Sequence, residues 1–123
     1  MNFEAIHREA YEAGMKAGNG ASPVPMVVGS PSTPLGNDVD RKKEHWFVAD
    51  GVCGFAWVHF KGNTPWGRWA KKNKIASKDY PSGLMVWVRE FGQSMQRKEA
   101  FAAAYAAVLR KYGIDAYSNS RMD

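Results

Sequence analysis

The segment 51–62, GVCGFAWVHFKG, constrains the fold more than any other part of the chain. Its residues alternate as they do in a β-strand, but both alternating sets are apolar. One set includes Phe55 and Trp57, and the other includes Ala56 and Val58. A strand with two apolar faces lies in the middle of its sheet and is covered on both sides. The sequence therefore predicts a central strand here, with packing on each face.

Three helices are predicted around this strand. The ranges 3–17 and 101–112 carry apolar residues three and four positions apart, which indicates one buried stripe on each helix. Gly18 is expected to end the first helix as its C-terminal cap. A shorter helix is predicted over 64–76, because Thr64 is a good N-cap and is followed by proline.

The remaining segments predict a mostly antiparallel sheet. Strands are expected over 45–50, 51–62 and 83–91, with edge strands at best over 23–31 and 114–117. Residues 30–43 are polar, rich in Pro, Ser and Asp, and predict a mobile surface loop. We therefore expect an α+β fold in one domain, residues 1–123. Its sheet has about four to five short strands, flanked by an N-terminal helix, a short middle helix and a long C-terminal helix.

The charge balance favours anionic partners. The chain has 17 Lys and Arg against 12 Asp and Glu, a formal net charge of +5. Nucleic acids, nucleotides and membrane surfaces are the anionic partners that such an excess attracts. Five tryptophans in 123 residues add aromatic rings, which can stack on bases or simply fill the core.

Several kinds of chemistry are not supported by the sequence. The three histidines, His7, His45 and His59, show no metal-ligand spacing, and Cys53 is the single cysteine, in an apolar run. No nucleophile motif or phosphate-binding glycine loop is present, so we expect no catalysis, no metal and no cofactor. No apolar run approaches the roughly 18 residues of a membrane span, and no leader pattern opens the chain, so a cytoplasmic location is expected.

The stretch FGQSMQRKEAF, residues 91–101, is the sharpest candidate for a binding site. It predicts a strand end, a glycine turn and a helix start, where unpaired backbone N–H groups bind anions. Arg97 and Lys98 fall in the first helical turn, where cations are unfavourable unless an anion is present. Gln93 and Ser94 can donate to the same anion or cap the helix. The alternative is that the cations pair with nearby glutamates or project into water.

Two further segments combine cations with aromatic rings. Trp66, Arg68 and Trp69 lie in a lysine-rich stretch that suits base stacking and phosphate contact, or else forms an ordinary amphipathic helix. One compromise buries Trp69 and leaves Trp66 on a cleft.

The C-terminal stretch YSNSRMD has the same character. Tyr117 can stack on a base, Ser120 can donate a hydrogen bond, and Arg121 can bind a phosphate through two N–H groups. The alternative is a tail whose charge is simply solvated. A short strand before it would hold this tail against the domain.

The segments DGVCGFAWV, RWAKKN, VWVREFGQSMQRKEAFAAAYAAVLRKYGI and AYSNSRMD resemble a widespread family of small phage and prophage proteins. The likeness covers residues 50–123, and the loop at 30–43 lies outside it. Within these phage proteins, the sequence resembles the anti-CBASS sponge family or the related Thoeris anti-defence sponges. The resemblance implies tight binding of a cyclic nucleotide immune signal without cleavage. It also implies a symmetric homo-oligomer, a dimer or tetramer, with ligand pockets near the subunit interfaces.

Two functions follow as expectations. The first is sequestration of a cyclic nucleotide, most simply a cyclic dinucleotide, in the cytoplasm of a bacterial host. The second is a macromolecular partner: a basic protein that binds nucleic acid, or an inhibitor that docks on a bacterial defence enzyme. A small hydrolase is a third option, and the missing acid–base groups argue against it.

Overall fold

The fold is α+β, as predicted. The computed structural model describes residues 1–21, 26–29, 45–48 and 53–123. In chain order the elements are α1 (Phe3–Gly20), β1 (Met26–Gly29), β2 (His45–Val48), β3 (Gly54–Phe60), α2 (Pro65–Lys72), β4 (Ser77–Lys78), β5 (Leu84–Trp87), α3 (Met95–Lys111) and β6 (Ala116–Met122). Among these residues, no helix is long and apolar enough to cross a membrane.

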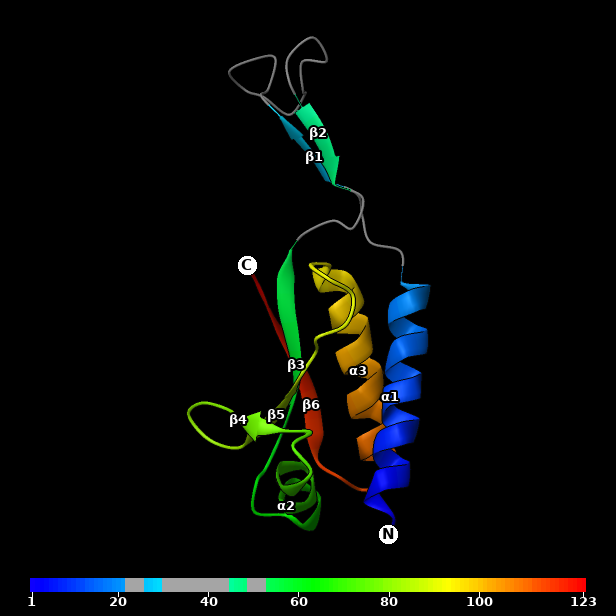
Figure 1. The fold of residues 1–123 in the computed structure, drawn as a ribbon, viewed down its shortest axis with the longest axis vertical. Helices are drawn as coiled ribbons and strands as arrows, with labels where there is room; N and C mark the ends of the chain where they lie inside the picture. The colour runs from blue at the N-terminus through cyan, green and yellow to red at the C-terminus, as the bar shows by residue number, and fades with distance from the viewer. Residues whose placement is uncertain (22–25, 30–44, 49–52) are drawn as a thin grey trace.

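The main sheet has four antiparallel strands in the order β4-β5-β3-β6 (Figure 1). The predicted central strand is confirmed, because β3 pairs with β5 on one edge and with β6 on the other. A separate two-stranded sheet joins β1 to β2, with Met26 opposite Val48. The predicted loop at 30–43 lies outside the described residues.

Strand β6 is longer than predicted. The sequence indicated a short strand over 114–117 followed by a tail, whereas Ala116–Met122 pairs with β3 along its whole length. Polar residues such as Ser118 and Asn119 gave no strand signal of their own. The strand forms because the exposed edge of β3 offers a complete row of backbone partners.

Helix α1 begins at an Asn2 cap, whose side chain accepts a hydrogen bond from the Ala5 amide at 3.1 Å. Its buried residues fall on one stripe: Ile6, Ala10, Gly14 and Gly18. The prediction that Gly18 ends the helix is wrong, since the helix continues to Gly20. Gly18 is instead a packing position, because a Cβ atom there would overlap the ring of Phe91.

Helix α3 is the clearest prediction to be confirmed. Phe101, Tyr105 and Leu109 are buried along one face, and the helix ends just before Gly113, whose φ is +79°. The short middle helix is also found, with the Thr64 hydroxyl accepting from the Gly67 amide. This helix, α2, ends at Lys72, four residues earlier than predicted.

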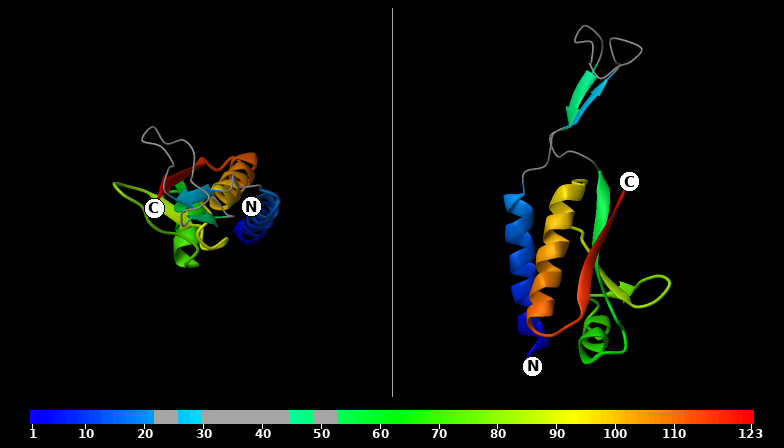
Figure 2. Two further views of the ribbon diagram at one scale, coloured as in Figure 1. Left: turned by 90° about the horizontal axis from the view of Figure 1, so that it is seen from above. Right: turned by 180° about the vertical axis from the view of Figure 1, so that it is seen from behind.

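The described helices pack on one side of the sheet. Helix α3 lies against β3 and β6, and α1 packs beside α3 (Figures 1 and 2). Helix α2 closes one end of this layer, where Trp66 meets the rings of Phe3 and Phe60. The inward residues of β3 are buried, including Ala56, Val58 and Phe60.

The opposite face of β3 differs from the prediction. The sequence indicated cover on both faces, but no described helix packs on the face that carries Phe55, Trp57 and His59. These side chains are half-buried. They gain their partial burial from rings on the neighbouring strands, so an apolar face here does not require a second layer.

Candidate functional site

The predicted anion site at the start of α3 is a structural junction. The Ser94 hydroxyl caps the helix by accepting from the Arg97 amide, and Ser94 itself is 1% exposed. The Arg97 guanidinium donates to the carbonyl oxygens of Gly18 and Asn19, at 3.1 and 3.4 Å. Its charge therefore lies at the C-terminal end of α1, where carbonyl groups lack helical partners and a cation is favourable.

Lys98 also contacts the protein rather than open water. It is 5% exposed, and its Nζ donates to the Gly54 carbonyl at 3.3 Å and lies 5.3 Å from the centre of the Phe55 ring. Gln93 is exposed, and its backbone carbonyl accepts from the Gly54 amide. An anion site at this turn stays a prediction, since both cations already have contacts with α1 or β3.

The exposure of the two α2 tryptophans is the reverse of the expected one. Trp66 is 1% exposed, and Trp69 is half-buried. The rings of both residues pack on Phe3, which places them in the core between α1 and α2. Arg68 is exposed and donates to the Asn63 carbonyl at 3.1 Å.

Two of the predicted residues of the C-terminal stretch, Tyr117 and Arg121, lie on the uncovered face of the sheet. Tyr117 is 52% exposed and stacks on His59, with ring centres 4.8 Å apart. The Arg121 guanidinium lies over the Phe55 ring at 5.5 Å. The Ser120 hydroxyl points to the opposite face of the sheet and donates to the Glu99 carboxylate of α3 at 2.9 Å.

Aromatic side chains project from this uncovered face, which we call the outer face. It comprises the side chains that alternate with the buried ones on β3, β5 and β6: Phe55, Trp57, His59, Met85, Trp87, Tyr117, Asn119 and Arg121. Trp57 and Trp87 are directly opposite in register, with ring centres 5.7 Å apart and an angle of 8° between the rings. The Phe55 ring lies 5.3 Å from the Trp87 ring.

Sequence reasoning missed most of the outer face. Only Tyr117 and Arg121 of this set were predicted as ligand contacts. Phe55 and Trp57 were assigned to a strand covered on both faces, and Trp87 was placed in a strand without any binding role. Their alternation was the available signal, but the uncovered face became visible only once the positions of the helices were known.

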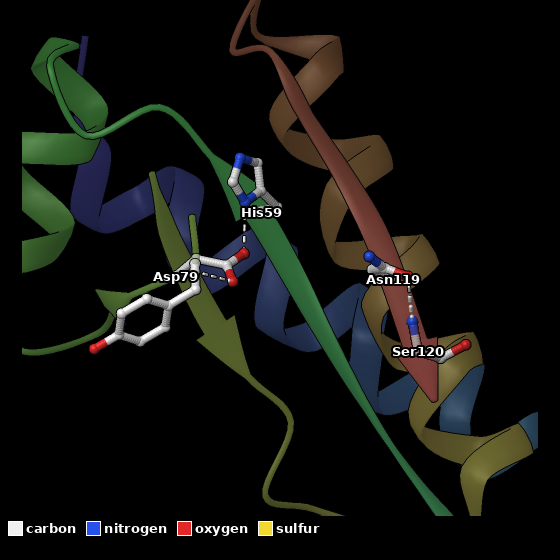
Figure 3. Close-up of polar contacts among 5 residues, drawn as sticks. His59, Asp79, Asn119 and Ser120 are labelled. Atoms are coloured by element: carbon white, nitrogen blue, oxygen red, sulfur yellow. Dashed lines mark hydrogen bonds and ion pairs between the residues drawn. The ribbon is translucent and has the colours of Figure 1, made fainter. Parts of the chain in front are cut away.

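His59 lies at the end of the outer face nearest to α2. Its Nδ1 and Oδ2 of Asp79 are 2.6 Å apart, and both side chains are largely buried, at 17% and 15% exposed (Figure 3). A polar cavity of about 570 Å³ adjoins the ring, lined by His59, Lys61, Gly62, Asn63, Ser82 and Gly83. The outer face thus ends in a hollow whose wall includes a fixed imidazole.

His7 on α1 is half-buried and faces Tyr105 of α3. Its Nδ1 lies 2.6 Å from the Tyr105 hydroxyl. Burial lowers the pKa of His7 and raises the pKa of Tyr105. Tyr11 lies on α1, as His7 does. The Glu90 carboxylate raises the pKa of Tyr11 by accepting a hydrogen bond from its hydroxyl group.

Two other cavities adjoin residues of the helices, and the smaller of them also adjoins Trp87. One of about 390 Å³ adjoins Trp66 and Ile114, and one of about 240 Å³ adjoins His7 and Glu90. Within the described ranges, no three His, Cys, Asp or Glu side chains are grouped to hold a metal ion. No protein-family model, curated protein or solved structure matches this chain.

Proposed function

We propose that this protein binds nucleotides by stacking their bases on the outer face of its sheet, and that it does not transform them. The observation that carries the proposal is the parallel Trp57–Trp87 pair, flanked by the rings of Phe55 and His59 on the same face. Base–aromatic stacking contributes about 1–3 kcal/mol per base. Rings held in register on strands are ordered before the ligand arrives, which reduces the entropy lost on binding.

The charge of the outer face suits a phosphate-bearing ligand. Arg121 lies over the Phe55 ring and is exposed, so its guanidinium is available beside the rings. Lys61 is exposed next to His59 at the other end of the face. A ligand that stacks along β3 would therefore have a cation near each end, in a chain of net charge +5.

A cyclic dinucleotide is the ligand that we favour, with sequestration of an immune signal in a bacterial host as the role. The resemblance to phage anti-defence sponges supports this choice, and so does the number of stacked ring pairs on the outer face. Trp57–Trp87 and His59–Tyr117 are two such pairs. Two neighbouring platforms match a ligand with two bases and two phosphates.

Tight sequestration needs more enclosure than one open sheet face gives. We therefore retain the predicted homo-oligomer as part of the proposal, with a second copy covering the ligand. Strand β6 lies at the edge of the sheet and, among the described strands, is paired only to β3, so its outer backbone groups can meet a second copy. Light scattering with and without ligand tests whether the mass corresponds to a dimer or tetramer.

Single-stranded nucleic acid is a second candidate ligand. The observation that favours it is the openness of the outer face on a four-stranded sheet, because aromatic rings on such a face stack successive unpaired bases. Both candidate ligands would use the same rings. Binding measurements with a panel of ligands are therefore needed to distinguish a cyclic dinucleotide from single-stranded nucleic acid.

Titrations of tryptophan fluorescence against a panel test the proposal. The panel contains cyclic dinucleotides, cyclic trinucleotides, cyclic ADP-ribose isomers, single-stranded oligonucleotides and duplex DNA. We expect Trp87→Leu to weaken binding of the preferred ligand by about tenfold or more, since a stacking ring is lost. Tyr112→Leu is the matched control, because it removes a 36% exposed ring at the end of α3, away from the outer face.

Three outcomes would reject the proposal or part of it. Binding that is unchanged in Trp87→Leu would remove the outer face from the site. A panel in which only duplex DNA binds would exclude base stacking. Recovery of a cleaved ligand after heat denaturation of the complex would show that the protein is an enzyme.

A further inference from the structure

The His59 ring is held in one orientation by contacts on two of its sides. Its Nδ1 lies 2.6 Å from Oδ2 of Asp79, and its face stacks on Tyr117 at 4.8 Å. The Asp79 carboxylate is itself fixed, because its Oδ1 accepts from the Tyr80 amide at 2.7 Å. An imidazole with these neighbours cannot rotate freely, so its remaining nitrogen points in a defined direction.

The Asp79 carboxylate also decides where the proton of the neutral ring lies. A carboxylate only accepts hydrogen bonds, so Nδ1 of His59 must be the donor in this pair. The neutral ring then carries a lone pair on Nε2. That nitrogen is a hydrogen-bond acceptor, and it points away from Asp79 (Figure 3).

The Cε1–Nε2 edge of the ring lies next to Gly83, which lines the cavity at the end of the outer face. His59 is one wall of this cavity, whose other lining residues include Lys61, Ser82 and Gly83. A Cβ atom at position 83 would lie 2.6 Å from Cε1 and 2.9 Å from Nε2 of the ring. Gly83 therefore gives the ring edge its space, and its φ of +86° also favours glycine.

The cavity lies next to the stacking rings. His59 follows Trp57 by two residues on the same face of β3, which is a separation of about 7 Å along a strand. A ribose is joined directly to its base, so a base that stacks on the outer face near Trp57 brings its ribose close to His59. We infer that His59 recognises the ribose: its Nε2 accepts a hydrogen bond from the 2′-hydroxyl of a ribonucleotide bound on the outer face.

This inference rests on the proposed function, and it adds a preference for ribose over 2′-deoxyribose. A neutral Nε2 lone pair accepts from a hydroxyl and gives no hydrogen bond to a phosphate oxygen, which is also an acceptor. The 2′-hydroxyl is the donor that distinguishes RNA from DNA at a given site. Lys61, in the same cavity wall, is the group suited to the adjoining phosphate.

The test compares ligands that differ only in the 2′-hydroxyl. Oligo(U) and oligo(dU) of equal length form one pair, and cyclic di-AMP with its 2′-deoxy counterpart forms the other. For whichever pair binds, we expect the ribose form to bind about five- to tenfold more tightly, the size of one net hydrogen bond in a largely buried site. His59→Phe keeps a ring against Tyr117 but removes the acceptor, so the ratio of ribose to deoxy affinity should fall to about one, whatever the change in stacking does to both forms.

A second variant tests the role of the carboxylate. Asp79→Asn can donate to Nδ1, which moves the ring proton to Nε2, so the ribose preference should fall while deoxy binding is kept. Equal affinity of both forms for the unsubstituted protein overturns the inference and leaves the proposed function intact. So does a ribose preference that persists in a folded His59→Phe protein. Failure of every ribose and deoxy ligand to bind rejects the proposed function, and the inference with it.

Discussion

Lys98 is a buried cation whose described contacts are a carbonyl oxygen and an aromatic ring. Its Nζ donates to Gly54 and lies against Phe55, at the point where β3 begins. This contact links the first turn of α3 to the central strand. At the scale of a single residue, Lys98 therefore contributes to stability whether or not a ligand binds nearby.

Substitution of Lys98 should separate its packing from its hydrogen bond. Lys98→Met keeps an unbranched chain but leaves the Gly54 carbonyl without this donor, so we expect a loss of about 1–2 kcal/mol in the free energy of unfolding. Lys98→Ala also removes the buried methylenes and should cost more, about 2–4 kcal/mol. Urea unfolding measures both, with the exposed Lys16→Met as control, expected within about 0.5 kcal/mol of the unsubstituted protein. Equal stability of all four proteins would contradict the buried contact.

His7 makes stability depend on pH. Burial lowers its pKa below the ordinary 6.5, so the unfolded chain binds the proton more readily than the folded protein does. Its contribution is therefore complete above pH 6.5 and is lost as the pH falls from 6.5 towards the lowered pKa. Nδ1 of the neutral ring lies within hydrogen-bond distance of the Tyr105 hydroxyl, which stays protonated because burial raises the pKa of Tyr105.

The variant His7→Gln removes this titration while keeping a side chain that can reach Tyr105. We expect the unsubstituted protein to lose more stability than the variant between about pH 7 and pH 5, because only the former must protonate a half-buried ring. Thermal unfolding at several pH values measures the difference. Parallel pH profiles for the two proteins would show that His7 titrates as it does in the unfolded chain.

At the scale of elements, glycines set the distance between α1 and α3. A Cβ atom at Gly14 would lie 2.7 Å from Cδ2 of the Phe101 ring, a separation that normal packing does not allow. Glycine in a helix usually costs stability relative to alanine. Here its small size is needed, because the Phe101 ring of α3 lies directly against the backbone of α1 at this position.

Alanine substitutions on α1 should therefore have opposite effects at different positions. Gly14→Ala is expected to destabilise the protein by about 1–3 kcal/mol through overpacking against Phe101. Gly20→Ala is the matched control, since a Cβ there meets no atom within 4 Å, and it should be neutral or slightly stabilising. A stabilising Gly14→Ala would mean that the helices can separate at little cost.

The elements show which parts of this fold can be read from the sequence. Local signals predicted the helices well: the apolar stripe from Phe101 to Leu109 and the Thr64 cap both appear in the structure. Properties that depend on distant partners were missed. The strand over 116–122 forms because β3 offers it hydrogen-bond partners, and the face of Trp57 is uncovered because the described helices pack on the other side.

The candidate site follows the same division. Tyr117 and Arg121 were predicted from residue type, and they lie on the outer face. Arg97 was predicted from its position at a helix start. The sequence could not reveal that the C-terminal end of α1 lies beside it and engages its guanidinium. A cation at a helix N-terminus therefore signals either a bound anion or a neighbouring helix end, and only tertiary structure tells them apart.

At the scale of the whole molecule, the sheet separates two chemically different sides. One side of the sheet is buried by the helices. The other side presents aromatic rings, with Arg121 near one end of the array and Lys61 near the other. In the proposed function, buried structure and ligand contact therefore fall on different faces of one strand, β3. We expect substitutions on the outer face to change binding with little effect on the core.

The salt dependence of binding should distinguish the two candidate ligands of this face. A cyclic dinucleotide has two phosphates, so the slope of log K against log salt should be no steeper than roughly −1.4, about a sevenfold loss between 50 and 200 mM. A strand that contacts four phosphates should give roughly −3 and about a fiftyfold loss. Arg121→Ala should reduce either slope by roughly 0.7–1, whereas Lys16→Gln removes an exposed charge on the helix layer and should leave it unchanged. A steep slope that responds equally to both variants would show that the net charge of +5, and not the outer face, governs association.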